Sequence, residues 1–231
     1  MAATVQKLTT TSYAVLGLIA IRPVTTYELA RQISRGGQYW LHSRSKLFEE
    51  PKRLAAAGLA TATPGATGNR PRTVYTITDA GRAALAAWMA APSEPPVLES
   101  EHLLKLFYAD LGTKADLLAT IEGLRAWAQD ELTRNAVLAR QYLAGLGDYQ
   151  HRSAILVLTG KFTADFAESA LRWADAAHEE VSAWPEDLAA APVDRAAMIR
   201  MTELGQSQAA ATSSATSVSV TRRTAGSSSW R

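Results

Sequence analysis

The segment Thr25-Thr26-Tyr27-Glu28 has the spacing of a helix capping box, which constrains how the first third of the chain folds. In such a box the Thr25 hydroxyl accepts a hydrogen bond from the backbone N–H of Glu28, and the Glu28 carboxylate accepts one from the N–H of Thr25. Val24 and Leu29 occupy the hydrophobic-staple positions on either side of the cap. We therefore predict a short helix that begins here and ends at the glycine pair 36–37.

A second helix is predicted from Ser43 to Ala57, with Gly58 as its left-handed C-terminal cap. Two short helices in tandem are typical of a helix-turn-helix, in which the second helix enters a DNA groove. Pro51 lies inside this second helix and removes one backbone donor, so a kink is predicted there. The piece from Ser43 to Glu50 is then the part presented to DNA.

The flanking segments predict the rest of a winged helix. A nearly apolar helix, capped by Thr11 or Ser12 and running through Ile21, suits a buried position under the helix-turn-helix. After Gly58, two short strands are predicted at 59–63 and 73–77, around a turn-rich basic loop at 64–72. This pattern indicates a β-hairpin wing, and an ordinary surface hairpin is the alternative.

Thr78 is expected to cap a further helix from Asp79 to about Ala91. The apolar stripe predicted for this helix consists of Leu85, Trp88 and Met89. The sequence therefore predicts a first domain at 1–91. Three prolines within residues 92–98 indicate a linker, because proline cannot continue a helix.

Charge separates the two halves of the chain. Residues 1–91 hold eleven Lys or Arg against four Asp or Glu, a net +7, whereas residues 92–231 hold thirteen against eighteen, a net −5. A polyanionic partner would therefore bind the first half. The chain has no cysteine, which excludes disulfides and thiolate metal sites. The longest aliphatic run, Ala14 to Ile21, is too short to span a bilayer, and we expect a cytoplasmic protein without membrane contact.

The second half is predicted to be all-helical over residues 99–185. A short helix over 99–110 precedes two long helices that form an antiparallel hairpin, and Thr113 with Asp116 predicts the cap of the first long helix. One small wing domain cannot cover the apolar stripe of so long a hairpin, which favours a second copy as partner. Residues 186–204 are expected to hold a short helix or irregular extension, and the Ser/Thr/Ala-rich residues 205–231 are expected to be disordered. The stripe predicted for the second long helix is Ile155, Leu158, Phe162, Phe166, Trp173, Ala177, Val181 and Trp184.

The order of these elements, together with Tyr75-Thr76-Ile77-Thr78-Asp79-Ala80-Gly81-Arg82 and Leu104-Lys105-Leu106-Phe107, resembles the PadR family of transcriptional regulators. The resemblance implies a mainly α fold, with an N-terminal winged helix-turn-helix and a C-terminal α-helical dimerisation domain. It also implies a homodimer that binds a pseudo-palindromic operator in double-stranded DNA. Such a dimer usually represses a gene and is released by a small aromatic or drug-like effector.

Candidate DNA contacts follow from the chemistry of each position. At the start of the second helix, serine hydroxyls and the helix dipole suit phosphate, Arg44 suits guanine, and the following lysines suit phosphates. For Tyr27 a packed core position is an equal alternative to a phosphate contact, and Arg53 has the alternative of lying over the helix end. The wing tip suits the minor groove or the backbone. The full set is Tyr27, Ser43, Arg44, Ser45, Lys46, Lys52, Arg53, Asn69, Arg70 and Arg72.

The sequence argues against catalysis. His42, His102, His151 and His178 show no metal-ligand spacing, and no nucleophile elbow or phosphate-cradling loop occurs, so neither enzyme activity nor a cofactor is predicted. Six aromatic side chains in the second half suit an effector pocket between protomers, with packing in the dimer core as the alternative. These six are Phe107, Trp127, Tyr142, Phe162, Phe166 and Trp173. A protein-protein interaction module built on a winged-helix scaffold remains the alternative function.

Overall fold

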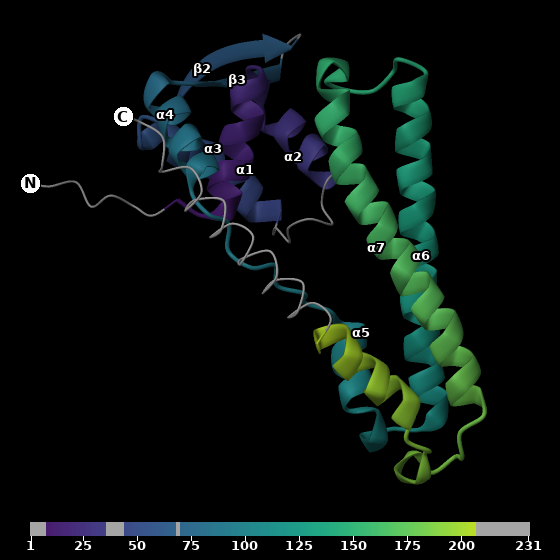
Figure 1. Cartoon of the computed structure of the whole chain (residues 1–231). Coiled ribbons are helices and arrows are strands. Elements are labelled where there is room, and N and C mark those ends of the chain that lie inside the picture. The colour runs from purple at the N-terminus through teal and green to yellow at the C-terminus, as the bar shows by residue number, and fades with distance from the viewer. Residues whose placement is uncertain (1–7, 36–43, 68–69, 207–231) are drawn as a thin grey trace, which may run out of the picture. The chain divides into compact units, whose positions relative to one another are not determined.

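The structure is a computed structural model that describes residues 8–35, 44–67 and 70–206 of the chain. The side chains of 33–35, 44–47, 66–67 and 70–71 are outside this description. The chain divides into two compact units, Met1–Val97 and Leu98–Arg231. Figure 1 traces their elements. The predictions for Ser43, Asn69, the glycine pair 36–37 and the tail from residue 207 lie outside the described residues.

Helix α1 (Thr10–Ile21) begins two residues earlier than predicted. Thr9 is its N-cap, and a Thr9–Ser12 capping box satisfies two backbone donors, with Thr9 N–H donating to Ser12 Oγ at 2.9 Å. Serine at the third helical position performs the role usually taken by Glu or Gln, which is why the sequence pattern did not reveal this box. The buried face of α1 comprises Ser12, Val15, Leu16 and Ile19.

The predicted capping box at the start of α2 (Thr26–Arg35) is confirmed. Thr25 N–H donates to Glu28 Oε2 at 2.8 Å, and Glu28 N–H donates to Thr25 Oγ1 at 3.3 Å. The residues before the helix form an additional short strand, β1 (Val24–Thr25), which pairs antiparallel with residues 74–75. Leu29 is fully buried, so the box fixes the rotation of α2 on the core.

Helix α3 (Arg44–Ala56) ends as predicted. Gly58 has φ +73°, and its N–H donates to Ala55 O, while Leu59 N–H donates to Leu54 O at 2.9 Å. A left-handed residue without Cβ ends the helix without strain. The assigned helix continues through Pro51, whose ring is among the most deeply buried side chains of the unit. The proline does not end α3, because its ring is packed in the core beside Leu54, and the kink remains a prediction.

The wing is a three-stranded antiparallel sheet in the order β1-β3-β2. Strands β2 (Ala60–Thr67) and β3 (Arg70–Ile77) extend through most of the segment that we predicted to be a loop. Pro64 lies in the edge strand β2, and Pro71 lies beyond the short stretch of β3 that pairs with β1. Proline has no backbone N–H to donate, so it is tolerated where that side of the strand makes no hydrogen bonds to a neighbouring strand. The prediction of a loop was therefore wrong for residues 64–67 and 70–72, and residues 68–69 lie outside the described part.

Helix α4 (Asp79–Ala90) starts at the predicted cap, where the Thr78 hydroxyl accepts from Gly81 N–H at 3.1 Å and donates to Gly58 O at 2.7 Å. Gly81 is required at this junction, because a Cβ there would lie 2.1 Å from the Leu59 carbonyl oxygen. Met89 is 71 % exposed, so its place in the predicted stripe was wrong. The core of the unit consists of Val15, Leu16, Ile19, Val24, Leu29, Leu54, Ala60, Tyr75 and Ile77.

The second unit is helical throughout its described part. Helix α5 (Glu101–Phe107) and the 3₁₀ helix η1 (Ala109–Leu111) lead into α6 (Lys114–Leu143), so the predicted helix at 99–110 is two shorter pieces. The predicted Thr113–Asp116 capping box is confirmed, with Asp116 N–H donating to Thr113 Oγ1 at 3.1 Å. The 3₁₀ helix η2 (Gln150–Arg152) precedes α7 (Ser153–Ser182), and η3 (Leu188–Ala190) and a helix at 195–206 follow.

Helices α6 and α7 form the predicted antiparallel hairpin, visible as the pair of long helices in Figure 1. The face that α7 turns inward matches the predicted stripe only near its C-terminal end, where Val181 is buried and Ala177 and Trp184 pack against the same cluster. Further toward the N-terminus Thr163, Ala167 and Ala174 are buried, whereas the large side chains predicted there are on the surface. Small residues allow two helix backbones to approach closely. The exposed members are Ile155 at 57 %, Leu158 and Phe162 at 70 %, Phe166 at 43 % and Trp173 at 45 %.

The architecture confirms the predicted mainly helical fold, with a winged helix-turn-helix in the first unit and long helices in the second. None of the helices within the described ranges is long and apolar enough to cross a membrane.

Candidate nucleic-acid interface

Helix α2 presents Tyr27 and Arg31 on its exposed side. The Tyr27 ring is 74 % exposed, which rules out the packed core position that we considered for it. Arg31, also exposed, follows four residues later and therefore lies one helical turn along the same face. Our sequence reasoning missed Arg31, although its spacing from Tyr27 was the signal that would have revealed it.

The predicted contacts at the start of the second helix lie in the first turn of α3. Arg44, Ser45 and Lys46 are its first three residues, and Ser43 immediately precedes it. Their backbone N–H groups therefore belong to the helix N-terminus, whose partial positive charge favours anions. The positions of these side chains are outside the described part of the structure.

The two basic residues in the second half of α3 differ in environment. Lys52 Nζ lies 2.9 Å from Glu49 Oε1, and both side chains are more than 60 % exposed. The hydrogen bond from Lys52 to Glu49 raises the pKa of the lysine, which remains a solvated cation. Arg53 instead lies 3.4 Å from Oε2 of Glu50, whose side chain is only 7 % exposed. Arg53 therefore compensates a buried carboxylate, a role that sequence analysis had not assigned to it.

Arg72 is the wing contact whose side chain the structure describes. It is exposed on β3 and pairs in register with Gly65 on β2. A Cβ on Gly65 would lie 3.6 Å from Arg72 Cγ and 3.7 Å from its Nε, so the stem of the arginine crosses the glycine. Arg70 begins the same strand near the wing tip. The side chains of Arg70 and Asn69 are outside the described part.

Acidic groups of this unit serve the fold. Glu28 Oε1 accepts from Arg22 at 3.2 Å, and the bond from the Thr25 backbone, followed by those from the Thr25 hydroxyl and Arg22, lowers the pKa of Glu28. Its carboxylate is therefore engaged by Thr25 and Arg22 at the start of α2. Among the described residues no group of three or more His, Asp or Glu is placed to hold a metal ion.

The six aromatic residues predicted for an effector pocket do not line one cavity in a single chain. Trp127 and Phe166 meet edge to face, with ring centroids 6.0 Å apart. Phe107 and Phe162 are at least 70 % exposed, and the Tyr142 hydroxyl donates to the Asp148 carbonyl near the hairpin turn. Because the prediction concerned a cavity between protomers, it stays a prediction.

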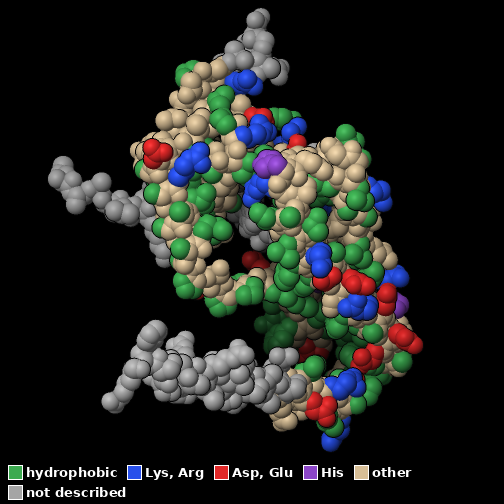
Figure 2. All heavy atoms as spheres, turned by 45° about the horizontal axis from the view of Figure 1, so that its top comes forward, with side chains coloured by type: hydrophobic (Ala, Val, Ile, Leu, Met, Phe, Trp, Pro, Cys, Tyr) green, Lys and Arg blue, Asp and Glu red, His purple; other side chains and the backbone are tan. Residues whose placement is uncertain are grey.

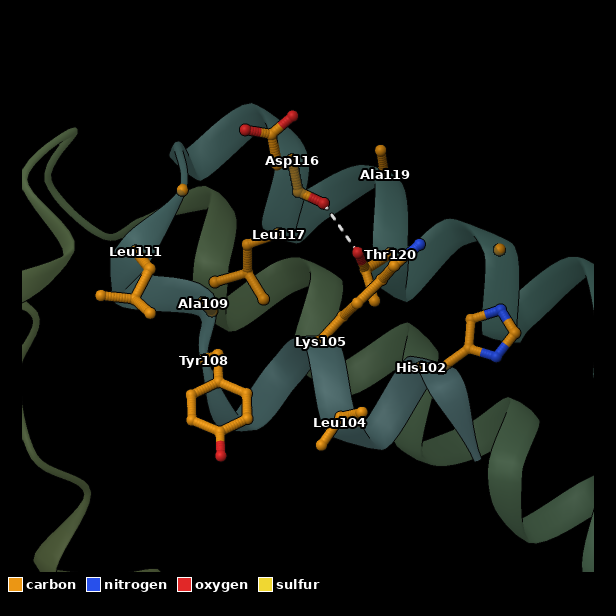
Figure 3. Close-up of a pocket in the computed structure, with 12 residues that line it drawn as sticks. His102, Leu104, Lys105, Tyr108, Ala109, Leu111, Asp116, Leu117, Ala119 and Thr120 are labelled. Carbon is orange, nitrogen blue, oxygen red and sulfur yellow. Dashed lines mark hydrogen bonds between the residues drawn. The ribbon is translucent and has the colours of Figure 1, made fainter. Parts of the chain in front are cut away.

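The second unit has a groove that the sequence did not indicate (Figure 3). It measures about 720 Å³ and lies where α5 and η1 pack against the first half of α6. Gly123 on α6 permits this packing, because a Cβ there would lie 3.2 Å from His102 Nε2 on α5. The groove is lined by the aliphatic side chains of Leu104, Ala109, Leu111, Leu117 and Ala119, together with the polar side chains of His102, Lys105, Tyr108, Asp116 and Thr120.

Two family models match this chain. The model described as Transcriptional regulator PadR-like family matches residues 15–87, and the one described as Virulence activator alpha C-term matches residues 99–182. A probable transcriptional regulator from Mycobacterium tuberculosis is 29 % identical over 181 residues, which cover 71 % of this chain and 93 % of that protein. The negative transcriptional regulator PadR of Bacillus subtilis is 27 % identical over 99 residues, which cover 42 % and 54 % respectively.

Solved structures show the same fold. Bacillus subtilis PadR in complex with operator DNA superimposes with a TM-score of 0.63 at 18 % identity, covering 74 % of this chain and 98 % of that one. The Vibrio cholerae virulence activator AphA gives a TM-score of 0.58 at 22 % identity, covering 75 % and 99 %. Both matches leave about a quarter of this chain without a counterpart, and the second family model ends at residue 182.

Proposed function

Because this chain belongs to the PadR-like family of transcriptional regulators, we propose that it binds operator DNA as a homodimer and represses transcription from a nearby promoter. The observation that carries the DNA contact is the exposed Tyr27–Arg31 face of α2, the helix that precedes α3 in the chain. This face belongs to the half of the chain with a net charge of +7. The proposal includes a cytoplasmic location, because the DNA to be regulated lies there.

The proposed contacts divide by chemistry. Arg44 at the first turn of α3 reads a guanine through its bidentate guanidinium, and Ser43, Ser45 and Lys46 bind nearby phosphates. Tyr27 and Arg31 on α2 bind the adjacent backbone. Asn69, Arg70 and Arg72 of the wing reach the flanking groove or backbone. Lys52 adds a positive charge that attracts DNA at longer range. Arg53 stays in this set as a phosphate contact, because its side chain is 40 % exposed although it also pairs with Glu50.

The homodimer is supported by the surface of α7. Its exposed stripe of large apolar and aromatic side chains runs over five turns, from Ile155 to Trp173. Figure 2 shows hydrophobic side chains at the molecular surface among acidic and basic ones. An apolar strip of this length marks an interface. A two-fold copy covers such a strip and also supplies the second DNA-binding unit for a pseudo-palindromic site.

We extend the proposal to a small aromatic or drug-like effector that releases the operator. One solved structural relative is Bacillus subtilis PadR in complex with p-coumaric acid. In this chain the exposed aromatic rings of α7 suit a flat ligand held between protomers. This extension is tested by adding each of a panel of phenolic acids to the preformed protein–DNA complex and measuring release of the DNA. If none of them releases the DNA, the proposal of an effector of this class is wrong.

Footprinting of the DNA upstream of its own gene, with purified full-length protein, tests the proposed function. The expected result is a protected site with two related half-sites. Arg44→Ala weakens binding by about 1–3 kcal/mol and relaxes base preference at one position of each half-site. Arg140→Ala is the matched control, because Arg140 is an exposed arginine in the last turn of α6, outside the proposed DNA contacts and the stripe of α7. Equal affinity of wild type and Arg44→Ala would contradict the assignment of α3.

A further inference from the structure

The chain continues beyond the residues that the second family model matches, and the structure describes further helices there. The second family model ends at residue 182, but η3 (Leu188–Ala190) and the helix at 195–206 follow within the described range. The last helix has a proper N-cap, since Ala197 N–H donates to Asp194 Oδ1 at 2.8 Å and Met198 N–H donates to Asp194 O at 3.2 Å. We call residues 195–206 the terminal helix.

The terminal helix is amphipathic, and its apolar face is open in a single chain. Met198 and Met201 are three residues apart, and Ala197 and Leu204 lie on the same side of the helix. Met198 is 58 % exposed and Met201 69 % exposed. Methionine adapts its shape to an irregular apolar surface, and two of them on one face are typical of a docking helix.

The first part of this extension, η3, packs beside the α5–α6 groove. Leu188 of η3 and Ala109 of η1 pack against the same buried cluster, which includes Leu117, Ile121 and Val181. Ala109 also lines the groove. Lys114 fastens the same region, because its Nζ donates to Ser182 O at 2.9 Å and to Trp184 O at 2.6 Å.

The groove offers an apolar surface that the rest of the chain leaves exposed. Leu104 is 58 % exposed, Tyr108 53 % and Leu111 81 %, and Figure 3 shows all three at the groove beside Leu117. Lys105 Nζ is paired with Glu101 Oε1 at 2.8 Å, so the positive charge of Lys105 on the α5 side of the groove has a partner. The surface therefore suits the apolar side of a helix.

We propose that the terminal helix of one chain docks in the α5–α6 groove of a second copy. Only residues 191–194 separate η3 from the terminal helix, a span of at most about 14 Å at roughly 3.5 Å per residue. Although η3 packs beside the groove, the terminal helix leaves both its own apolar face and the groove exposed. The two apolar surfaces therefore do not cover each other within one chain, and a short hinge between them favours exchange with a second copy. The proposal rests on the homodimer proposed above and adds a reciprocal pair of contacts to it.

The absence of cysteine makes an unambiguous test possible. Leu104→Cys and Met201→Cys are purified separately, one with a size tag, then mixed and oxidised. Docking between copies predicts a disulfide-linked species containing one chain of each. Leu146→Cys replaces the groove variant as the control, because Leu146 is 78 % exposed but lies beyond the opposite end of α6. The proposal is overturned if no disulfide-linked species with one chain of each variant forms. It is also overturned if a Leu104→Cys/Met201→Cys double variant forms only intrachain disulfides.

A second measurement uses the intact chain and a control on the same helix. Met198→Lys/Met201→Lys is expected to weaken dimerisation roughly tenfold in sedimentation equilibrium. Ile199→Lys is expected to leave it unchanged, because Ile199 has the same 58 % exposure but lies off the apolar face. Equal effects of both changes would overturn the proposal. If wild type fails to dimerise or to bind DNA, the proposed function fails; if it does both and only the crosslink is missing, the helix exchange alone fails.

Discussion

The guanidinium of Arg53 lies 3.4 Å from a carboxylate oxygen of Glu50, a residue that is 5 % exposed. The other carboxylate oxygen, Oε1, is buried without a hydrogen-bond partner among the described residues. Glu50 therefore depends on Arg53 for compensation of its charge. This pair holds the end of α3 on the core, next to the buried Pro51.

We predict that Arg53→Ala destabilises the first unit by about 1–3 kcal/mol, because it leaves a buried carboxylate uncompensated. Chemical denaturation monitored by circular dichroism gives the change in free energy of unfolding. Lys52→Ala is the control, since its partner Glu49 is in solvent, and its effect on stability should be negligible. Adding Glu50→Gln to Arg53→Ala should recover part of the loss, and no recovery would show that Arg53 acts through another group.

The capping box of α2 should make stability depend on pH. Hydrogen bonds from Thr25 and Arg22 lower the pKa of Glu28 below the ordinary value of about 4.3. The folded form thus binds the proton less tightly than the unfolded form, so this stabilisation is present above the ordinary value and is lost as pH falls through the lowered one. At pH 7 Glu28→Ala, which removes the carboxylate of the box, should cost about 1 kcal/mol, and the difference from wild type should shrink below pH of about 4. A difference that stays constant down to pH of about 2 would refute this account.

Gly81 should be intolerant of any side chain. A Cβ at this position would lie 2.1 Å from the Leu59 carbonyl oxygen, so Gly81→Ala must separate α4 from the start of the wing. We predict a loss of at least about 2 kcal/mol. Gly17→Ala in α1 is the matched control, because nothing lies within 4 Å of its Cβ, and it should be neutral or stabilising by up to about 1 kcal/mol. Thermal unfolding of the two variants compares them directly.

Lys114, the first residue of α6, should be important for the stability of the second unit. Its side chain is 13 % exposed and donates to two carbonyl oxygens at the end of α7. Lys114→Met keeps the apolar stem but leaves these carbonyls unpaired, which should cost about 1–3 kcal/mol. Lys161→Met, at an exposed position of α7, provides the comparison. If both variants unfold at the same denaturant concentration as wild type, Lys114 does not fasten α7.

Local hydrogen-bond chemistry was the part of this fold that the sequence revealed best. The Thr25–Glu28 and Thr113–Asp116 boxes and the left-handed Gly58 each depend on residues close in sequence, and all three were predicted. The length of the wing strands was missed, because Pro64 is acceptable only on an edge strand, and edge position is a property of the whole sheet.

Helical periodicity identified the inward face of α7 only at its C-terminal end, around Val181. The large residues around Phe162 and the small ones around Ala167 both recur at helical spacing, and close approach to α6 selects the small ones. For the candidate site, residue chemistry suggested Arg53 as a phosphate contact, but its buried partner Glu50 could be seen only in three dimensions. The α5–α6 groove depends on Gly123, a glycine without any local signal for a turn.

The central claim is that a basic winged unit, held in two copies, binds one duplex. Titration of labelled upstream DNA at a series of salt concentrations tests it most directly, with the stoichiometry measured at saturation. We predict two chains per duplex and a logarithm of affinity that falls with the logarithm of salt by about 0.9 for each phosphate contact, with a slope about 1 shallower in Arg72→Ala. Absence of affinity for any duplex at low salt, or one chain per site with no salt dependence, would contradict the account.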